Sequence, residues 1–240
     1  MSTIKNQNKR DSLVRPKKTF RQILKLSVYI FLGLLLILLL IFYLLYLSAQ
    51  REPEFYREAK SVPIEVQQTR NAAVVDKIRT LNNDFQSRRK NWSSTFSAEE
   101  INAYLAVEAT KPGANLLPPD LQEPRIVFIA GSVGIACRVQ QRGLTAILNL
   151  SLGASMPEPN KLVFRMRNSQ AGALPLSKDY IAQTIANVLR KKWGNVTQGN
   201  EGGDPTFTVQ LNLKNKAGRN VKVESFEIRP GVIQFSGTTD

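Results

Sequence analysis

The segment from Leu26 to Ser48 contains no charged residue and reads LSVYIFLGLLLILLLIFYLLYLS. At a rise of about 1.5 Å per residue, about 20 apolar residues form a helix that crosses the ~30 Å hydrocarbon core of a bilayer. Tyrosines lie towards both ends of the segment, where an apolar ring with a hydrated hydroxyl is favoured. The segment therefore predicts one transmembrane helix over residues 26–48.

A cleaved signal peptide and a buried core helix are the alternatives for this segment. The apolar part of a signal peptide usually has about 7–15 residues and is followed by small residues at the cleavage site. Here the run is longer and ends in the bulky Tyr46 and Leu47. A core helix usually keeps a polar face, which this segment lacks. We therefore expect an uncleaved signal anchor.

Basic residues are concentrated before the span. Residues 1–25 contain eight Lys and Arg against the single acid Asp11, whereas the basic residues just after the span are interleaved with glutamates. The positive-inside rule therefore places residues 1–25 in the cytoplasm and the C-terminal part outside it, in a single-pass protein of the plasma (inner) membrane. This tail carries half of the formal net charge of +14, so we do not expect nucleic acid as a partner.

Histidine is absent and Cys137 is the only cysteine. Without histidine, the chain lacks the commonest general base, the Ser-His-Asp triad and the usual ligands of catalytic zinc. A single cysteine allows no intramolecular disulfide. Cys137 is in phase with Ile135 and Val139 of an expected strand, which favours a buried structural thiol. We therefore predict a protein that is not an enzyme, with no catalytic residue, cofactor site or metal site.

Residues 49–92 are expected to form a stem and an amphipathic helix. Between Ile64 and Lys90, apolar residues recur at steps of three and four and their multiples, which places them on one helical stripe. Ser97 and Glu100 form a capping box that opens a second, short helix. The remaining domain is predicted over residues 93–240, because the periodicity of the chain changes beyond this helix.

Apolar residues then alternate with a period of two, which is typical of strands with one buried face. Short connections join the first four runs and favour an antiparallel meander. Ser177 caps a further helix, and residues 198–204 are predicted to be a glycine-rich loop. Three more strands follow, with a bulge or bend near Ser225. The expected strands are 126–129, 133–139, 144–154, 162–166, 207–213, 221–228 and 232–235.

The predicted fold class is α+β: one N-terminal transmembrane helix, then a helix, a four-strand antiparallel meander, a helix and three strands. The anchor, the helix opening FSAEEINAYL at 96–105, the meander and GALPL at 172–176 resemble the YpmS-like family of bacterial single-pass envelope proteins. The likeness covers most of residues 95–240 and implies no established enzyme activity. The pattern of helices on a curved sheet is also similar to the tubular lipid-binding domains, but fold alone does not give function.

Two hypotheses for function follow. In the first, the extracytoplasmic domain binds lipid or another apolar ligand on its apolar sheet face; the alternative is that the two helices close this face as a packed core. In the second, the chain is a structural or assembly component of a cell-envelope protein complex. It would then meet its partners through the helix 64–90 and the transmembrane span.

Both tryptophans follow three cations at the end of a predicted helix. The helix dipole favours cations there, by about 0.3–1 kcal/mol, and each tryptophan can simply pack against the domain. Alternatively, cations and an amphipathic ring make a contact for anionic lipid headgroups. The candidate headgroup residues are Arg88, Arg89, Lys90, Trp92, Arg190, Lys191, Lys192 and Trp193.

Overall fold

The structure is a computed structural model that describes residues 17–86, 91–108, 111, 121–141, 143–193 and 195–239. The side chains of residues 17–23, 141 and 191–193 are outside this description. The chain divides into two compact units, Met1–Leu45 and Tyr46–Asp240. Helix α1 spans Lys17–Ala49, and its part Leu24–Ala49 is long and apolar enough to cross a membrane. The prediction of an apolar helix over residues 26–48 is therefore confirmed.

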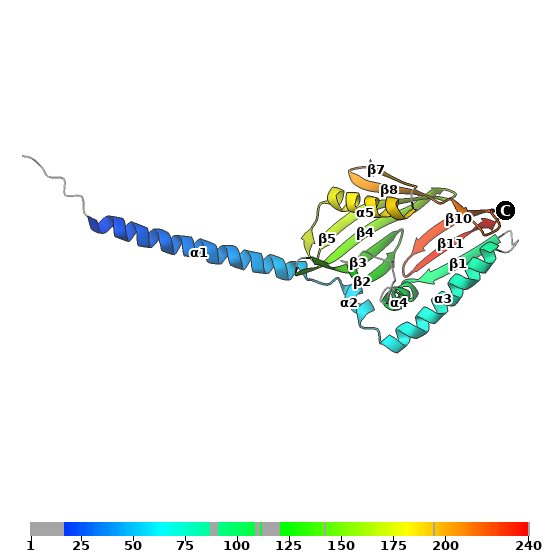
Figure 1. The fold of residues 1–240 in the computed structure, drawn as a ribbon, viewed down its shortest axis with the longest axis horizontal. Helices are drawn as coiled ribbons and strands as arrows, with labels where there is room; N and C mark the ends of the chain where they lie inside the picture. Colours follow the sequence, from blue (N-terminus) through cyan, green and yellow to red (C-terminus); the bar gives the residue numbers. More distant parts are fainter. Residues whose placement is uncertain are drawn as a thin grey trace, which may run out of the picture. The chain divides into compact units, whose positions relative to one another are not determined.

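The predicted four-strand meander is present in the second unit and forms one side of a larger antiparallel sheet, with β2 at its edge (Figure 1). Its strands are β2 (Leu121–Ile129), β3 (Ser132–Gln141), β4 (Leu144–Glu158) and β5 (Lys161–Ala171). Next to β5 lie β8 (Asp204–Gln210) and β7 (Val196–Glu201), and the short β6 (Leu174–Pro175) pairs with the end of β5. The order of this seven-stranded sheet is β2-β3-β4-β5-β8-β7, with β6 off the path.

The C-terminal strands and the first strand of the domain build a second sheet, which the sequence did not predict as separate. Its order is β1 (Asn91–Ser97), β11 (Val232–Thr239), β10 (Asn220–Arg229) and β9 (Leu213–Lys214). The register of β10 shifts between Val223 and Ser225, so the predicted bulge near Ser225 is confirmed. β10 lies against the turns of the first sheet: the Gly131 N–H donates to the Ile228 carbonyl (3.0 Å), and the Val223 N–H donates to Asn160 Oδ1 (2.6 Å).

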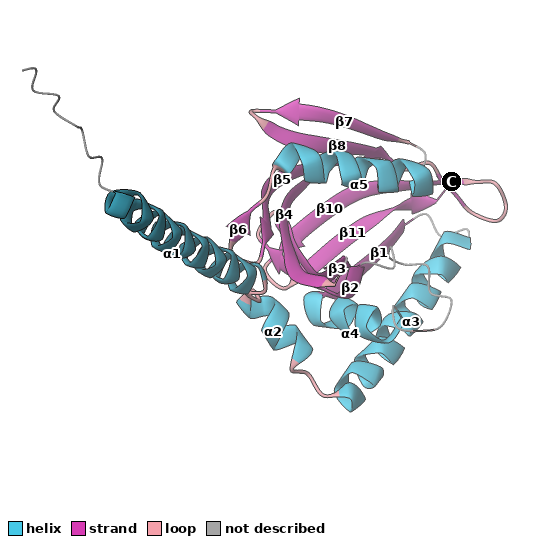
Figure 2. Cartoon of the chain, turned by 60° about the vertical axis from the view of Figure 1, so that its left-hand side comes forward, coloured by secondary structure: helices cyan, strands magenta, loops and turns pink. Residues whose placement is uncertain are grey.

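In the described part of the second unit, four helices pack around these sheets (Figure 2). They are α2 (Glu54–Lys60), α3 (Ile64–Gln86), α4 (Ala98–Glu108) and α5 (Lys178–Trp193). The capping box of α4 is confirmed, because the Ser97 N–H donates to Glu100 Oε2 (2.9 Å) and the Glu100 N–H donates to Ser97 Oγ (3.1 Å). The stripe of α3 is partly buried: Val74 is buried, but Ile78 remains 42% exposed. The last predicted residues of this helix, 87–90, lie outside the described residues.

Two parts of the predicted organisation need correction. Most of the predicted glycine-rich loop 198–204 belongs to β7, and the turn to β8 contains only Gly202 and Gly203. β1 was not predicted, and the domain boundary drawn between residues 92 and 93 falls inside this strand. Both strands are polar in sequence and are held by pairing with an apolar neighbour, β11 or β8. Their local pattern therefore gives a weak strand signal.

A side chain covers one edge of the seven-stranded sheet. Asn102 of α4 donates from Nδ2 to the Ile126 carbonyl (2.8 Å) and accepts from the Ile126 N–H at Oδ1 (2.7 Å). Ile126 lies on β2, which forms this edge. The amide therefore satisfies two backbone groups that a neighbouring strand would otherwise pair with.

Three apolar clusters hold the second unit together. α5 packs on one face of the larger sheet through Ala182 and Ala186, which meet Met166 and Phe207. α2 packs on the opposite face, where Tyr56 meets Ala136 and Ile147. The third cluster joins the second sheet to α3 and to the end of β4, and its members are Trp92, Val221, Val223, Leu81, Phe85, Met156, Leu211 and Phe235.

Candidate functional site

One face of the seven-stranded sheet carries apolar side chains from strand to strand. Ile135 of β3 pairs with Ile126 of β2 and with Leu150 of β4. Since paired residues of neighbouring strands point to the same side of a sheet, these side chains share one face, which we call the inner face. It is the face covered in part by α5, because Leu152 and Phe164 pack against the α5 cluster.

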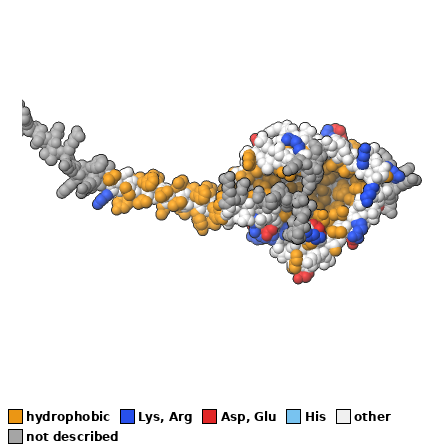
Figure 3. Space-filling view, viewed as in Figure 1, with side chains coloured by type: hydrophobic (Ala, Val, Ile, Leu, Met, Phe, Trp, Pro, Cys, Tyr) orange, Lys and Arg blue, Asp and Glu red, His pale blue; other side chains and the backbone are white. Residues whose placement is uncertain are grey.

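Many inner-face side chains are only half-buried. Phe128, Leu150 and Met166 are buried, as expected in a core. Their neighbours on the same face keep an intermediate exposure instead, and Figure 3 shows hydrophobic side chains recessed in a hollow of this unit. The half-buried apolar residues of this face are Ile126, Val133, Ile135, Val139, Leu148, Leu152 and Phe164. The inner face therefore borders a hollow and is not a fully packed core.

Strand β4 supplies the longest apolar row of this hollow. Every second residue from Leu144 to Met156 is apolar: Leu144, Ala146, Leu148, Leu150, Leu152, Ala154 and Met156. At about 3.3 Å per residue this row is about 40 Å long. It carries neither a charge nor a hydrogen-bonding side chain, so what it can do chemically is solvate hydrocarbon.

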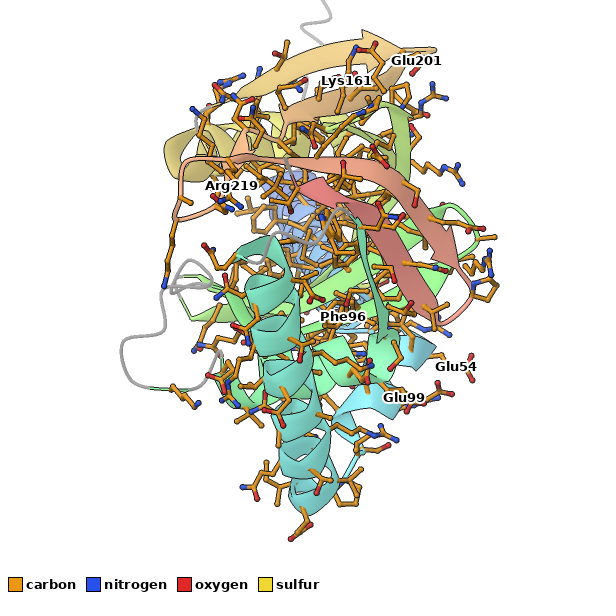
Figure 4. The ribbon with its side chains drawn as sticks, turned by 90° about the vertical axis from the view of Figure 1, so that its right-hand side faces the viewer. Glu54, Phe96, Glu99, Lys161, Glu201 and Arg219 are labelled. Carbon is orange, nitrogen blue, oxygen red and sulfur yellow. The ribbon has the colours of Figure 1, made fainter. Side chains whose placement is uncertain are left out.

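The hollow is closed at one end by the second sheet. Met156 packs into the third cluster, where Trp92 makes edge-to-face contacts with Phe85 (4.8 Å between ring centroids) and Phe235 (6.2 Å). Phe96 stacks on Phe235 with an interplanar angle of 12°, and Figure 4 shows Phe96 beside α3. Such aromatic pairs are stabilising beyond the area that they bury. This end is therefore filled by packed side chains.

Cys137 lies on the floor of the inner face, opposite Leu148. It is 6% exposed, and this burial raises the pKa of its thiol to about 11 from an ordinary value of 9.0. A thiol that stays protonated is a poor nucleophile. The prediction of a buried strand cysteine is confirmed. Among the described residues, no three His, Cys, Asp or Glu side chains are grouped so that they could hold a metal ion.

Charged groups gather on the opposite, outer face, beneath α2. The Tyr56 hydroxyl donates to Glu123 (3.3 Å); burial, reinforced by this carboxylate, raises the pKa of Tyr56 far above its usual range. Arg138 pairs with Glu123 (3.3 Å) and Lys60 with Glu52 (2.9 Å). These contacts fasten the stem to the sheet. They do not reach the hollow, because Tyr56 and Ala136 lie on the other face.

Of the candidate headgroup residues, the structure describes the side chains of Trp92 and Arg190. Trp92 is a strand residue and is 5% exposed, so its ring belongs to the core and is not available to a headgroup. Arg190 is exposed near the end of α5 and donates to Asn187 (3.2 Å). The α5 residues Lys191, Lys192 and Trp193 have side chains outside the description, and Arg88, Arg89 and Lys90 lie outside the described residues altogether.

Sequence reasoning predicted the apolar face but left open whether it is filled. It missed the contribution of the second sheet, since β1 was not recognised as a strand. The alternation of apolar residues along β4 was the available signal for the hollow. The chain matches no protein-family model, no curated protein and no solved structure. The resemblance to the YpmS-like family therefore stays a prediction.

Proposed function

We propose that this chain is a single-pass membrane protein whose outer domain binds a lipid hydrocarbon chain in the hollow between its two sheets. The observation that supports this proposal is the apolar inner face, many of whose side chains are only half-buried and which runs in register across β2, β3 and β4. Each methylene group removed from water contributes about 0.8 kcal/mol. A bound chain would cover the apolar surface that the protein itself leaves half-open.

The proposal includes no reaction. The chain has no histidine, and the one thiol is buried with a raised pKa. The apolar row of β4 offers no group that could transfer a proton or attack a substrate. We therefore propose a binding domain that is not an enzyme and needs no cofactor.

The proposed setting is the bacterial plasma membrane, as in the YpmS-like proteins that the chain resembles. α1 would act as an uncleaved anchor, with residues 1–25 in the cytoplasm and the outer domain in the cell envelope, since the basic residues precede the apolar segment. Protease added outside spheroplasts would then digest the outer domain and spare the N-terminal tail. Cleavage of the tail with protection of the C-terminus would overturn this orientation.

The binding proposal is tested with a photo-crosslinking amino acid in the full-length chain, reconstituted in nanodiscs that contain an isotope-labelled phospholipid. The test position is Ile135 on the inner face, and the control is Ser155, an exposed residue whose side chain points to the outer side of β4. We expect labelled lipid on Ile135 and little on Ser155. Equal labelling of both positions, or none on Ile135, would refute lipid binding in the hollow.

One observation favours the second candidate, a component of an envelope protein complex. α3 exposes Ile64 (54%), Val66 (39%) and Ile78 (42%), which is apolar surface that a partner could cover. Crosslinkers placed at these positions in intact membranes test it. A stoichiometric protein adduct on α3, together with an unlabelled Ile135, would favour this role over lipid binding.

A further inference from the structure

The apolar row of β4 has one closed end and one open end. At its closed end, Met156 is packed against Trp92 and Val221. At its open end, Leu144 is 57% exposed, just after the β3–β4 turn. Val139, which pairs with Ala146 on the same face, is also half-exposed there. Within the described residues, which leave out residues 112–120 and 142, the hollow therefore opens at the β3–β4 hairpin.

The open end is the end of the domain at which the chain enters it. The Gly172 N–H donates to the Ile147 carbonyl of β4 (2.6 Å), and the next residue, Ala173, donates its N–H to the Ser48 carbonyl (3.0 Å). Ser48 is thus tied to the β5–β6 turn, and this turn is tied to β4 three residues from Leu144. Three strand residues span about 10 Å.

Covalent connectivity limits how far this end can be from a bilayer. Under the proposed function, the hydrocarbon-spanning segment ends near Ser48, so the membrane surface lies within a few residues of it. Tyr180 is a further exposed side chain near this end. It lies in the first turn of α5, five residues after β6, and is 69% exposed. Tyrosine is favoured at the membrane–water interface.

We propose that the β3–β4 hairpin end is the mouth of the hollow, through which an acyl chain of a phospholipid enters from the bilayer that holds the anchor. This inference rests on the proposed function and adds to it the source and the route of the ligand. Leu144 contacts the bilayer hydrocarbon, and the row from Leu144 inwards continues that apolar environment. Because this row carries no charged side chain, the phospholipid headgroup stays outside the hollow.

The chain offers a matched pair of substitutions for the test. Leu144 and Ile129 are exposed to a similar extent (57% and 54%), but Ile129 lies next to the β2–β3 turn, at the other end of β3. Leu144→Glu and Ile129→Glu therefore introduce the same charge in place of comparable apolar surface. Only the first places it at the proposed mouth.

The readout is the labelled phospholipid captured at Ile135 in the full-length chain during a short illumination. With the label in the protein's own nanodisc, we expect Leu144→Glu to lower the yield by about tenfold or more, because burying a leucine in an apolar phase is worth about one to two powers of ten in an equilibrium constant. Ile129→Glu should leave the yield unchanged. Tyr180→Glu is an independent variant at the same end and should lower the yield in the same direction.

Two further experiments, one in micelles and one with separate vesicles, distinguish a failure of the proposed function from a failure of the proposed mouth. In detergent micelles the lipid reaches the hollow without a bilayer, so Leu144→Glu should label like the parent chain. A parent chain that captures no lipid in micelles or nanodiscs refutes the proposed function itself. Capture in nanodiscs that is unchanged by both Leu144→Glu and Tyr180→Glu refutes the mouth alone. Equal capture from separate labelled vesicles would refute the host bilayer as the source.

Discussion

Two apolar regions of this domain, the cluster around Trp92 on the second sheet and the row around Leu148 on the larger sheet, differ in how tightly they are packed. In the second sheet, Trp92 and Val221 are 5% and 2% exposed, because α3 and the end of β4 fill the space against them. On the inner face of the larger sheet, Leu148 and Phe164 keep an intermediate exposure. An alternating apolar pattern thus fixes which side of a strand is apolar. The elements that pack against this side decide whether it becomes part of the core or lines a cavity.

The largest expected effect tests this contrast directly. Trp92→Ala should lower the free energy of unfolding by about 3–5 kcal/mol, because it removes two aromatic contacts and leaves a void. Leu148→Ala should cost about 1–2 kcal/mol, roughly half of the usual value for a fully buried leucine. Urea unfolding of the delipidated full-length chain in micelles, followed by circular dichroism, measures both. Equal losses would mean that the inner face is packed as tightly as the second sheet.

A smaller effect concerns the floor of the hollow. The Cys137 thiol ionises near pH 9 in the unfolded chain and near pH 11 in the folded one, because burial raises its pKa. The stability that it contributes is complete below pH 9 and is lost as the pH rises to 11, by about 2–3 kcal/mol. Subtracting the pH profile of Cys137→Ala isolates this contribution. A difference that does not change with pH would show that water reaches the floor.

A final comparison, between two glycine variants, concerns the open end of the hollow. Gly172 and Gly131 both have a positive φ (+58° and +65°), so alanine costs about 1–2 kcal/mol of backbone strain at either position. An added Cβ at Gly131 meets nothing within 4 Å, whereas at Gly172 it would lie 2.6 Å from the Ala49 carbonyl carbon. Gly172→Ala should therefore cost a further 1–3 kcal/mol or so in urea unfolding. Identical losses would show that residues 48–49 are not held at the β5–β6 turn.

The sequence predicted those elements whose own residues carry the signal. The capping box needs only Ser97 and Glu100, and the meander needs only strong alternation with short turns. The bulge near Ser225 could be predicted because the alternation of apolar and polar residues shifts there. In each case the interaction that stabilises the element is local, or repeats along one strand. Local patterns are sufficient for such elements.

The sequence did not predict what depends on distant partners. β1 reads NWSSTFS and is a strand because Trp92 and Phe96 pack on Phe235, more than a hundred residues later. β7 reads VTQGNE and has Val196 as its one buried side chain. It is a strand because its backbone pairs with β8. The hollow depends on both sheets. Its openness could not be read from the apolar pattern of β4 alone.

If the chain is anchored as proposed, the amide of Asn102 has a consequence for many copies in one bilayer. Under the proposed anchoring, chains would diffuse in two dimensions, so their outer domains would meet more often than the same number of free domains in bulk solution. A bare β2 would offer each passing copy a row of unpaired backbone groups, and strand-to-strand growth could begin there. By bonding to both backbone groups of Ile126, Asn102 closes this starting point for polymerisation with a single side chain.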